Sequence, residues 1–301
     1  MDLIAERLLD QMASQGPLGD SAVALAEKRR LKATARTCAA VLTEHMQGSR
    51  FVPADLETSF GREDGAARLV VDAASGRCVL EGRIDRVDDW IEGGYLRVID
   101  YKRGGKALNL DSVWHGLSLQ LPVYLAAAMK RRGEKSAGVF YFNLDEGILT
   151  LQTTDRNAVE KQRRSAFRMT GLAIDDVDVL AAQSPNFPEV LSVRVSQSGA
   201  LYKGTLATDQ HGFEALTAHT LDAAARHLDA IRDGDAAVAP AEHHNGTPCA
   251  WCDWRAACLF DPRLDAACVR RFPAIKGDEV LERMVLRGDA VSPETPSAKG
   301  D

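Results

Sequence analysis

The residues best suited to chemistry lie in two short runs that are both predicted to be β-strands. The first run, 82–88, contains Asp85, and the second, 97–102, contains Asp100 and Lys102. Both runs alternate β-branched and polar residues, and a glycine-containing segment separates them. This pattern predicts a β-hairpin that carries two carboxylates and an ammonium group.

The position of the turn decides which of these side chains face each other. A turn centred on Glu92 and Gly93 places Asp85 opposite Asp100, and a turn centred one residue later places Asp85 opposite Lys102. In either register the three side chains share one face, about 5–8 Å apart. Only the intermediate register would separate them. Three such groups on one face suggest a site for a hard cation.

The chemistry that this set supports is hydrolysis of a phosphodiester. Mg²⁺ prefers oxygen ligands and keeps several waters, so Asp85, Asp100 and the carbonyl of Tyr101 would suffice to hold it. Lys102 could then orient or deprotonate the attacking water, or stabilise the transition state. The alternative is an ordinary ion pair on a solvated face, because a short D-x-K pattern is common by accident.

A glutamine and a tyrosine follow the hairpin on a predicted helix. Gln120 and Tyr124 are four residues apart and therefore share one helical face. They could position Lys102 or contact a DNA phosphate. The alternative is that Tyr124 belongs to the core and Gln120 is only its polar neighbour.

Taken together, these motifs resemble the RecB-type branch of the PD-(D/E)XK nucleases. The resemblance covers about residues 50–262 and is strongest to the C-terminal nuclease domain of AddB, one component of the AddAB helicase–nuclease. It rests on three segments of this sequence: Gly82–Asp88 (GRIDRVD), Val98–Gly104 (VIDYKRG) and Gly116–Tyr124 (GLSLQLPVY).

The resemblance implies a role for each residue of the three segments. Asp85, Asp100 and the Tyr101 carbonyl would bind Mg²⁺ or Mn²⁺, and Lys102 would be catalytic. Gln120 and Tyr124 would form the Q-x-x-x-Y motif of this branch. The implied partners are DNA, as duplex ends or a single strand, and an AddA-like helicase–nuclease subunit.

Three cysteines near the C-terminus form a C-x₂-C-x₅-C pattern: Cys249, Cys252 and Cys258. Thiolates at this spacing can converge on one metal centre. The resemblance implies a [4Fe–4S] cluster whose fourth cysteine lies upstream of the nuclease core and is missing from, or unidentified in, this chain. Cys38 precedes the core, but its helical context favours a small buried hydrophobic residue. A zinc-bound interaction module is the alternative for this region.

A second departure from the family concerns an upstream metal ligand. The RecB branch has a His or acidic residue on an N-terminal helix, and nothing within Met1–Met12 matches that motif. We therefore expect the chain to be a fragment that begins after this point. His115 could face the scissile phosphate, and His243 and His244 could bind a metal, although isolated loop histidines more often face solvent.

The elements around these motifs predict an α/β fold: a restriction-endonuclease-like core with a mixed sheet of four or five strands flanked by helices, and a C-terminal cysteine lobe. The expected divisions are an N-terminal helical flank (1–48), the nuclease core (49–235), the cysteine lobe (236–270) and a C-terminal helix with a disordered tail (271–301). Within the core we expect an antiparallel meander formed by 51–60, 68–71 and the hairpin, followed by a helix over 111–131. A buried strand over 137–142 with a hairpin partner over 148–153 should come next. The core should then continue with a mainly helical segment (156–183) and a long helix (209–233).

Composition excludes several other classes of protein. The 301 residues carry a net charge of −6 with acidic and basic residues interspersed, which argues against nucleic-acid binding by bulk charge alone. The sequence contains no Gly-x₄-Gly-Lys-Ser/Thr motif, so any ATP hydrolysis would belong to a partner. It has no apolar run of 18 residues and no signal-peptide pattern, so we expect a cytoplasmic protein without a membrane partner.

The predicted function is therefore a Mg²⁺-dependent exodeoxyribonuclease of an AddAB/RecBCD-like helicase–nuclease that repairs double-strand breaks by recombination. The alternative is a DNA-binding or assembly module with an incomplete, inactive nuclease site. The intact set of Asp85, Asp100 and Lys102 favours the enzyme, and the unmatched upstream ligand favours the alternative.

Overall fold

The computed structural model describes residues 2–15, 21–61, 68–145, 155–196, 199–244 and 246–291. The chain divides into two compact units, each assembled from three separate segments. The first unit contains the segment up to Thr58 with Ile84–Leu108 and Glu134–Ala207. The second contains Ser59–Arg83, Asn109–Gly133 and the segment from Thr208 onward.

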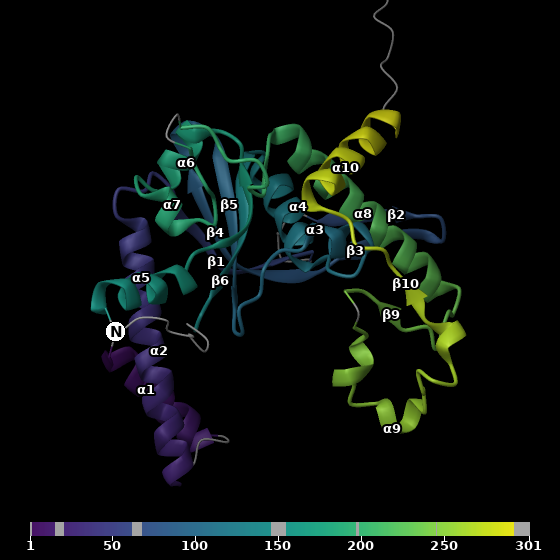
Figure 1. The fold of residues 1–301 in the computed structure, drawn as a ribbon, viewed down its shortest axis with the longest axis horizontal. Helices are drawn as coiled ribbons and strands as arrows, with labels where there is room; N and C mark the ends of the chain where they lie inside the picture. Colours follow the sequence, from purple (N-terminus) through teal and green to yellow (C-terminus); the bar gives the residue numbers. More distant parts are fainter. Residues whose placement is uncertain are drawn as a thin grey trace, which may run out of the picture. The chain divides into compact units, whose positions relative to one another are not determined.

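A six-stranded mixed sheet forms the centre of the first unit (Figure 1). Strands β4 and β5 are antiparallel, β5 and β6 are parallel, and β6 and β7 are antiparallel. The predicted α/β class with a mixed sheet is confirmed, although the sheet has more strands than the four or five expected. Its order is β1 (Val52–Phe60), β4 (Gly82–Trp90), β5 (Tyr95–Lys102), β6 (Lys135–Asn143), β7 (Thr170–Ile174) and β8 (Ala207–Thr208).

Strand β6 lies inside this sheet because its sequence is apolar on both faces. Every residue of β6 after Lys135 is buried, as the continuous apolar run predicts. Strand β1 is the edge strand, which is the position that Pro53 permits. The large side chains that fill the core of this unit include Phe51, Leu96, Ile99, Phe140, Phe142 and Leu172.

Helices of the first unit pack on this sheet and on one another. The predicted N-terminal helices are confirmed, and Arg164 of α5 pairs with Glu44 of α2 at 3.0 Å (Figure 1). The helices are α1 (Asp2–Gln15), α2 (Ala22–Met46), α5 (Arg156–Ala166), α6 (Val177–Gln183) and α7 (Phe187–Val190), with a 3₁₀ turn η1 (Ile91–Gly93).

One prediction about strands was wrong. The predicted meander does not form, because β2 (Leu69–Ala73) pairs with β3 (Gly76–Leu80) in a separate hairpin, while β1 pairs with β4. The segment 156–183 is mainly helical, as predicted, and β7 lies between its two helices. The predicted strand 148–153 lies outside the described residues.

The second unit contains the β2–β3 hairpin and the C-terminal elements. Asp209 caps its longest helix through a hydrogen bond from the Gly212 N–H (2.9 Å), as expected for a helix that begins there. The remaining elements are α3 (Leu110–Trp114), α4 (Gln120–Arg132), α8 (Gln210–Arg232), β9 (Ala241–Glu242), η2 (Pro248–Trp251), α9 (Arg255–Cys258), η3 (Ala266–Cys268), β10 (Arg270–Arg271) and α10 (Gly277–Val291).

The single helix predicted over 111–131 is two helices. Gly116 adopts a left-handed conformation (φ 74°) after α3, and α4 then begins at Gln120. Asn109, rather than Asp111 or Ser112, caps α3 by accepting hydrogen bonds from their backbone N–H groups. A β-carbon at position 116 would lie 2.8 Å from a ring nitrogen of the α8 residue His227, so glycine is required there for space as well as conformation.

Among the described residues, no helix combines the length and apolar character needed to cross a bilayer. The predicted disordered tail begins at 292, outside the described residues. The boundaries proposed for the nuclease core and the cysteine lobe stay predictions.

Candidate functional site

The register of β4 and β5 selects one of the two predicted alignments. Arg86 pairs with Ile99 and Trp90 pairs with Tyr95, so opposed residues follow the alignment that places Asp85 opposite Asp100. The turn closes through η1 and the left-handed Gly94 (φ 70°). Glycine adopts a left-handed conformation at little energetic cost, so Gly94 can close the turn in this register.

The two carboxylates and the lysine meet where the hairpin opens. Lys102 Nζ lies 2.7 Å from Asp100 Oδ2, and Asp85 Oδ2 accepts a hydrogen bond from the Tyr101 N–H (2.9 Å). Asp100 is 1% exposed, whereas the Lys102 side chain is 25% exposed and Asp85 is half-buried. The group is therefore buried at one end and accessible at the other.

The charge of Asp100 is poorly compensated. Burial raises the pKa of this carboxyl above its usual range, and the negative charge of Asp85 raises it further, while the Lys102 ammonium acts in the opposite direction. The Lys102 ammonium, at 2.7 Å, is the partner of Asp100 Oδ2, which has no other hydrogen bond from the described residues. A buried carboxylate oxygen with spare capacity is well suited to accept a cation.

The opposite face of the hairpin carries a different set of charges. Asp88 is fully buried and accepts hydrogen bonds from Arg86 Nε (2.5 Å) and Nη2 (2.9 Å) and from Arg97 Nε (2.9 Å). Arg97 also contacts the carbonyl and the side-chain oxygen of Gln183, each at 3.5 Å. Every group of this buried network has a partner, so it is a structural element.

The structure places Gln120 and Tyr124 on α4 in the second unit. Gln120 Nε2 donates a hydrogen bond to the Tyr124 hydroxyl at 3.0 Å, as their spacing predicts. Gln120 is exposed, and Tyr124 is half-buried with its ring against Phe60. The pair thus presents one amide and one hydroxyl toward solvent.

The cysteines of the C-x₂-C-x₅-C pattern carry free thiols but do not form a closed ligand set. Cys249 is partly buried in η2, whereas Cys252 and Cys258 are exposed. Within the described part of the chain, their sulfur atoms do not form a group of three within 4.8 Å of one another. Cys38 is buried in α2, its thiol donates to the Leu144 carbonyl (3.2 Å), and burial raises its pKa to about 11, as expected for a core residue rather than a ligand.

One group of potential ligands was not anticipated. Asp111, His115 and His243 each bring one donor atom within 4.8 Å of the others. Sequence reasoning considered the two histidines separately and did not consider Asp111 as a ligand. The available signal was the four-residue spacing of Asp111 and His115, which places both on one helical face.

The hairpin geometry agrees with a comparison to known families. The family model of the PD-(D/E)XK nuclease superfamily matches residues 2–259. This chain belongs to the PD-(D/E)XK nuclease superfamily. The assignment of this superfamily's two-part acidic motif to Asp85 and to Asp100-Tyr101-Lys102 stays a prediction.

Relatives of this PD-(D/E)XK chain are named as the B component of an ATP-dependent helicase/deoxyribonuclease. The chain is 34% identical to the protein of Moorella thermoacetica over 83% of its own length and 23% of the relative. It is 29% identical to that of Alkaliphilus metalliredigens (94% and 26%) and 30% identical to that of Bacillus subtilis (87% and 24%). The predicted resemblance to AddB is confirmed, and the chain spans about a quarter of the length of these relatives.

The superfamily implies a divalent metal such as Mg²⁺, and the residues of the hairpin fit one. The spare oxygen of Asp100, the facing carboxylate of Asp85 and the nearby backbone of Tyr101 supply oxygen donors only. Hard cations prefer this type of donor.

Proposed function

We propose that this chain is a Mg²⁺-dependent, or Mn²⁺-dependent, deoxyribonuclease that hydrolyses DNA phosphodiesters in exonuclease fashion. The observation that carries the proposal is the arrangement of Asp85, Asp100 and Lys102 at the open end of the β4–β5 hairpin. The buried Asp100 carboxylate has a raised pKa and lies opposite a second carboxylate, Asp85, which a merely structural ion pair does not require.

The metal would be held by Asp85, Asp100 and the carbonyl of Tyr101. When bound, it would lower the pKa of water and neutralise charge on the phosphate. Lys102 would contribute a fixed ammonium group beside the scissile phosphate, because the ion pair with Asp100 holds Nζ in place. A positive charge placed in advance stabilises the developing oxyanion without a reorganisation cost.

Gln120 and Tyr124 would contact the DNA. An exposed amide and a hydroxyl that already share a hydrogen bond form a small polar surface able to donate to phosphate oxygens. Because both groups are uncharged, their contribution would be positioning of the substrate rather than neutralisation of charge.

Cys249, Cys252 and Cys258 would provide three ligands of a [4Fe–4S] cluster, with the fourth supplied from elsewhere. Their spacing and free thiols support this, and cluster binding would have to draw the three sulfur atoms together. Anaerobic reconstitution with iron and sulfide should give a brown protein that absorbs near roughly 400 nm. A colourless protein that binds Zn²⁺ through the same cysteines would contradict this part of the proposal.

The relatives' names suggest the wider setting. We propose that the chain acts in the cytoplasm with an AddA-like helicase–nuclease subunit, on DNA ends fed to it during double-strand-break repair. No ATP-binding motif is present in this sequence, so the motor would belong to other parts of the assembly.

A nuclease assay with a matched pair of lysine variants tests the proposal. Wild type, Lys102→Ala and the exposed Lys203→Ala would each be incubated with linear duplex and single-stranded DNA, with Mg²⁺ or with a chelator. We expect metal-dependent cleavage by wild type and Lys203→Ala, and none by Lys102→Ala. Equal rates for wild type and Lys102→Ala would refute the assignment. DNA binding without cleavage by any variant would instead favour the DNA-binding or assembly module.

A further inference from the structure

A second group of metal-ligand side chains lies in the second unit and plays no part in the proposed nuclease chemistry. Asp111 and His115 come from α3 and its C-terminal cap, and His243 directly follows β9. Among the described residues, these three side chains each bring one donor atom within 4.8 Å of the other two.

The distances in this cluster are close to those of ligands around one ion. His243 Nε2 lies 2.8 Å from Asp111 Oδ2, and His115 Nε2 lies 3.2 Å from Asp111 Oδ1. Ligands bound tetrahedrally to Zn²⁺ at about 2.0–2.1 Å are about 3.3 Å apart. Both distances lie within about 0.5 Å of that separation, and one donor atom of each of the three residues lies within 4.8 Å of the others.

Burial distinguishes the cluster from a chance group of surface charges. The Asp111 side chain is 4% exposed, and those of His115 and His243 are each 10% exposed. Asp111 Oδ1 is buried without a hydrogen bond of acceptable angle, although it faces the His115 ring. An unsatisfied buried carboxylate oxygen directed at an imidazole nitrogen has the spare capacity that a cation would use.

Neighbouring groups orient the ligands. Ser112 Oγ lies 3.3 Å from His243 Nδ1, so the ring can donate through Nδ1 and keep Nε2 as the metal-binding nitrogen. His115 Nε2 lies 3.0 Å from the Pro273 carbonyl, which adds an oxygen beside the three side-chain donors. The Ser112 contact is on the nitrogen of His243 that would not bind the metal, and contacts of this kind commonly fix the tautomer and direction of a metal-bound histidine.

The backbone also holds these groups in place. Asn109 caps α3 through the N–H groups of Asp111 and Ser112, which fixes the first turn of the helix. Strand β9 pairs in parallel with β10, and His243 is tied to Gly246 by two backbone hydrogen bonds. Both sides of the cluster are thus built on hydrogen-bonded backbone.

We propose that Asp111, His115 and His243 bind a divalent first-row transition metal, Zn²⁺ foremost. Two imidazoles and one carboxylate form a borderline-soft donor set that favours Zn²⁺ over Mg²⁺, and the Pro273 carbonyl or a water would complete the coordination. The ion would connect α3 to the β9–β10 segment and stabilise the second unit.

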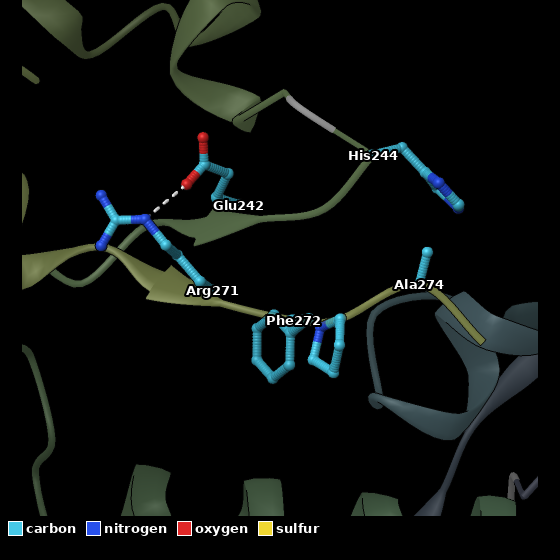
Figure 2. Close-up of a pocket in the computed structure, with 6 residues that line it drawn as sticks. Glu242, His244, Arg271, Phe272 and Ala274 are labelled. Carbon is cyan, nitrogen blue, oxygen red and sulfur yellow. Dashed lines mark ion pairs between the residues drawn. The ribbon is translucent and has the colours of Figure 1, made fainter.

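The cluster also has a route to solvent. Pro273 lines an open cavity of about 520 Å³ together with His244, Glu242, Arg271, Phe272 and Ala274. Figure 2 shows the Glu242–Arg271 ion pair at one end of this cavity and His244 at the other. A metal ion could reach the cluster from this side, as a binding site requires.

His244 provides a matched control for His243. It neighbours His243 in the chain, but its side chain is 51% exposed and its Nε2 is 2.9 Å from the amide nitrogen of Asn109. Because that amide occupies the ring nitrogen, His244 is expected not to bind the ion, although it lies 3.5 Å from Asp111.

The test measures Zn²⁺ binding in a background that lacks the three thiols of the C-x₂-C-x₅-C pattern. The full chain carrying Cys249→Ser, Cys252→Ser and Cys258→Ser would be titrated with Zn²⁺ by calorimetry, in excess Mg²⁺ to occupy hard-oxygen sites. His115→Gln, His243→Gln and His244→Gln would be compared in the same background. We expect one Zn²⁺ per chain, at least about a tenfold loss of affinity for the first two variants, and unchanged affinity for the third.

Co²⁺ absorption in the same triple-serine background gives a readout that needs no histidine variant. We expect visible d–d bands without thiolate charge transfer, together with an upward shift of the unfolding temperature when Zn²⁺ is added. Failure of the background protein to bind Zn²⁺, or equal affinity for all three histidine variants, would overturn the proposal. So would a loss in His244→Gln equal to that in His243→Gln.

Discussion

The two faces of the β4–β5 hairpin carry the same types of charged residue and use them in opposite ways. On one face Asp88 is enclosed by Arg86 and Arg97 and every polar group has a partner. On the other face Asp85 and Asp100 lie opposite each other, and one lysine serves two carboxylates. Successive residues of a strand point to opposite faces, so this contrast arises within a few residues of sequence.

The difference shows which buried charges stabilise the fold and which are held ready for a ligand. The Asp88 face has two guanidinium groups for one carboxylate, and those groups satisfy each of its oxygens. The Asp100 face has two carboxylates opposite each other and a raised carboxyl pKa. The first face contributes to folding, and the second is the face that we propose to be completed by a bound cation.

Replacing Asp100, on the face that we propose to bind the metal, should have the largest effect on DNA cleavage. We expect Asp100→Asn to lower kcat for DNA cleavage by about 10³-fold or more, within the range for loss of a group central to proton transfer or charge stabilisation. The free energy of unfolding at pH 7 should not fall, because the raised pKa of Asp100 means that folding disfavours its charge. Steady-state kinetics and urea unfolding would measure both. An active Asp100→Asn protein, or one destabilised as much as an Asp88 variant, would contradict the distinction between the Asp100 face and the Asp88 face.

The equivalent change on the Asp88 face should lower the stability of the fold and leave DNA cleavage largely unchanged. Asp88→Asn leaves Arg86 and Arg97 buried with too little negative charge, and breaking a buried ion pair in this way costs about 3–5 kcal/mol. Urea unfolding should show this loss. Cleavage per folded molecule should change far less than in Asp100→Asn, and a loss of about 10³-fold in both would mean that the two faces are not functionally distinct.

His45, which feels the charges of Arg86 and Arg97 on the Asp88 face, should make the free energy of unfolding depend on pH. Burial, together with the charges of Arg97 and Arg86, lowers the pKa of His45 from 6.5 to about 4. Because the folded-state pKa is depressed, the contribution of neutral His45 to the free energy of unfolding is fully present above about pH 6.5. It is lost as the pH drops toward 4, by about 3 kcal/mol in total. His45→Gln should flatten this part of the unfolding profile, whereas the exposed His211→Gln should not. A parallel decline in all three proteins would contradict the assignment.

The smallest effect is expected on α4. Gln120→Ala and Tyr124→Phe each remove one neutral hydrogen-bonding group, worth about 1 kcal/mol, so cleavage should fall by roughly 3–10-fold. Their free energies of unfolding should stay within about 0.5 kcal/mol of wild type, because Gln120 is exposed and the Tyr124 ring is retained. Kinetics at several DNA concentrations would show whether KM or kcat changes. Losses as large as that of Asp100→Asn would place these residues in the chemical step.

Local sequence patterns were sufficient to predict the hairpin and the residues on its open end. The position of the turn left two alignments that place the three side chains on one face and one that separates them, and the structure adopts one of the first two. The continuous apolar run of β6 and the long helix predicted over 209–233 were equally informative. In each case the deciding interaction lies within or directly beside the segment.

The errors came from interactions between distant segments. Nothing local to β1 shows that it pairs with β4 rather than with β2, because either strand could satisfy its backbone groups. Gly116 follows α3 in a left-handed conformation, and His227, more than a hundred residues away, lies where a β-carbon at this position would point. The grouping of Asp111 and His115 with His243 depends likewise on the return of the chain after α8.

The division of the chain into units has a consequence for its engineering. The backbone passes from one unit to the other at Thr58, Arg83, Leu108, Gly133 and Ala207, so each unit is interrupted by the other. The first unit, which carries Asp85 and Lys102, cannot be excised as a continuous piece without taking along the helix that carries Gln120, which belongs to the second unit. A chimaera with another nuclease would therefore have to exchange the interleaved segments together, and a single crossover at any junction between Arg83 and Gly133 would divide both units.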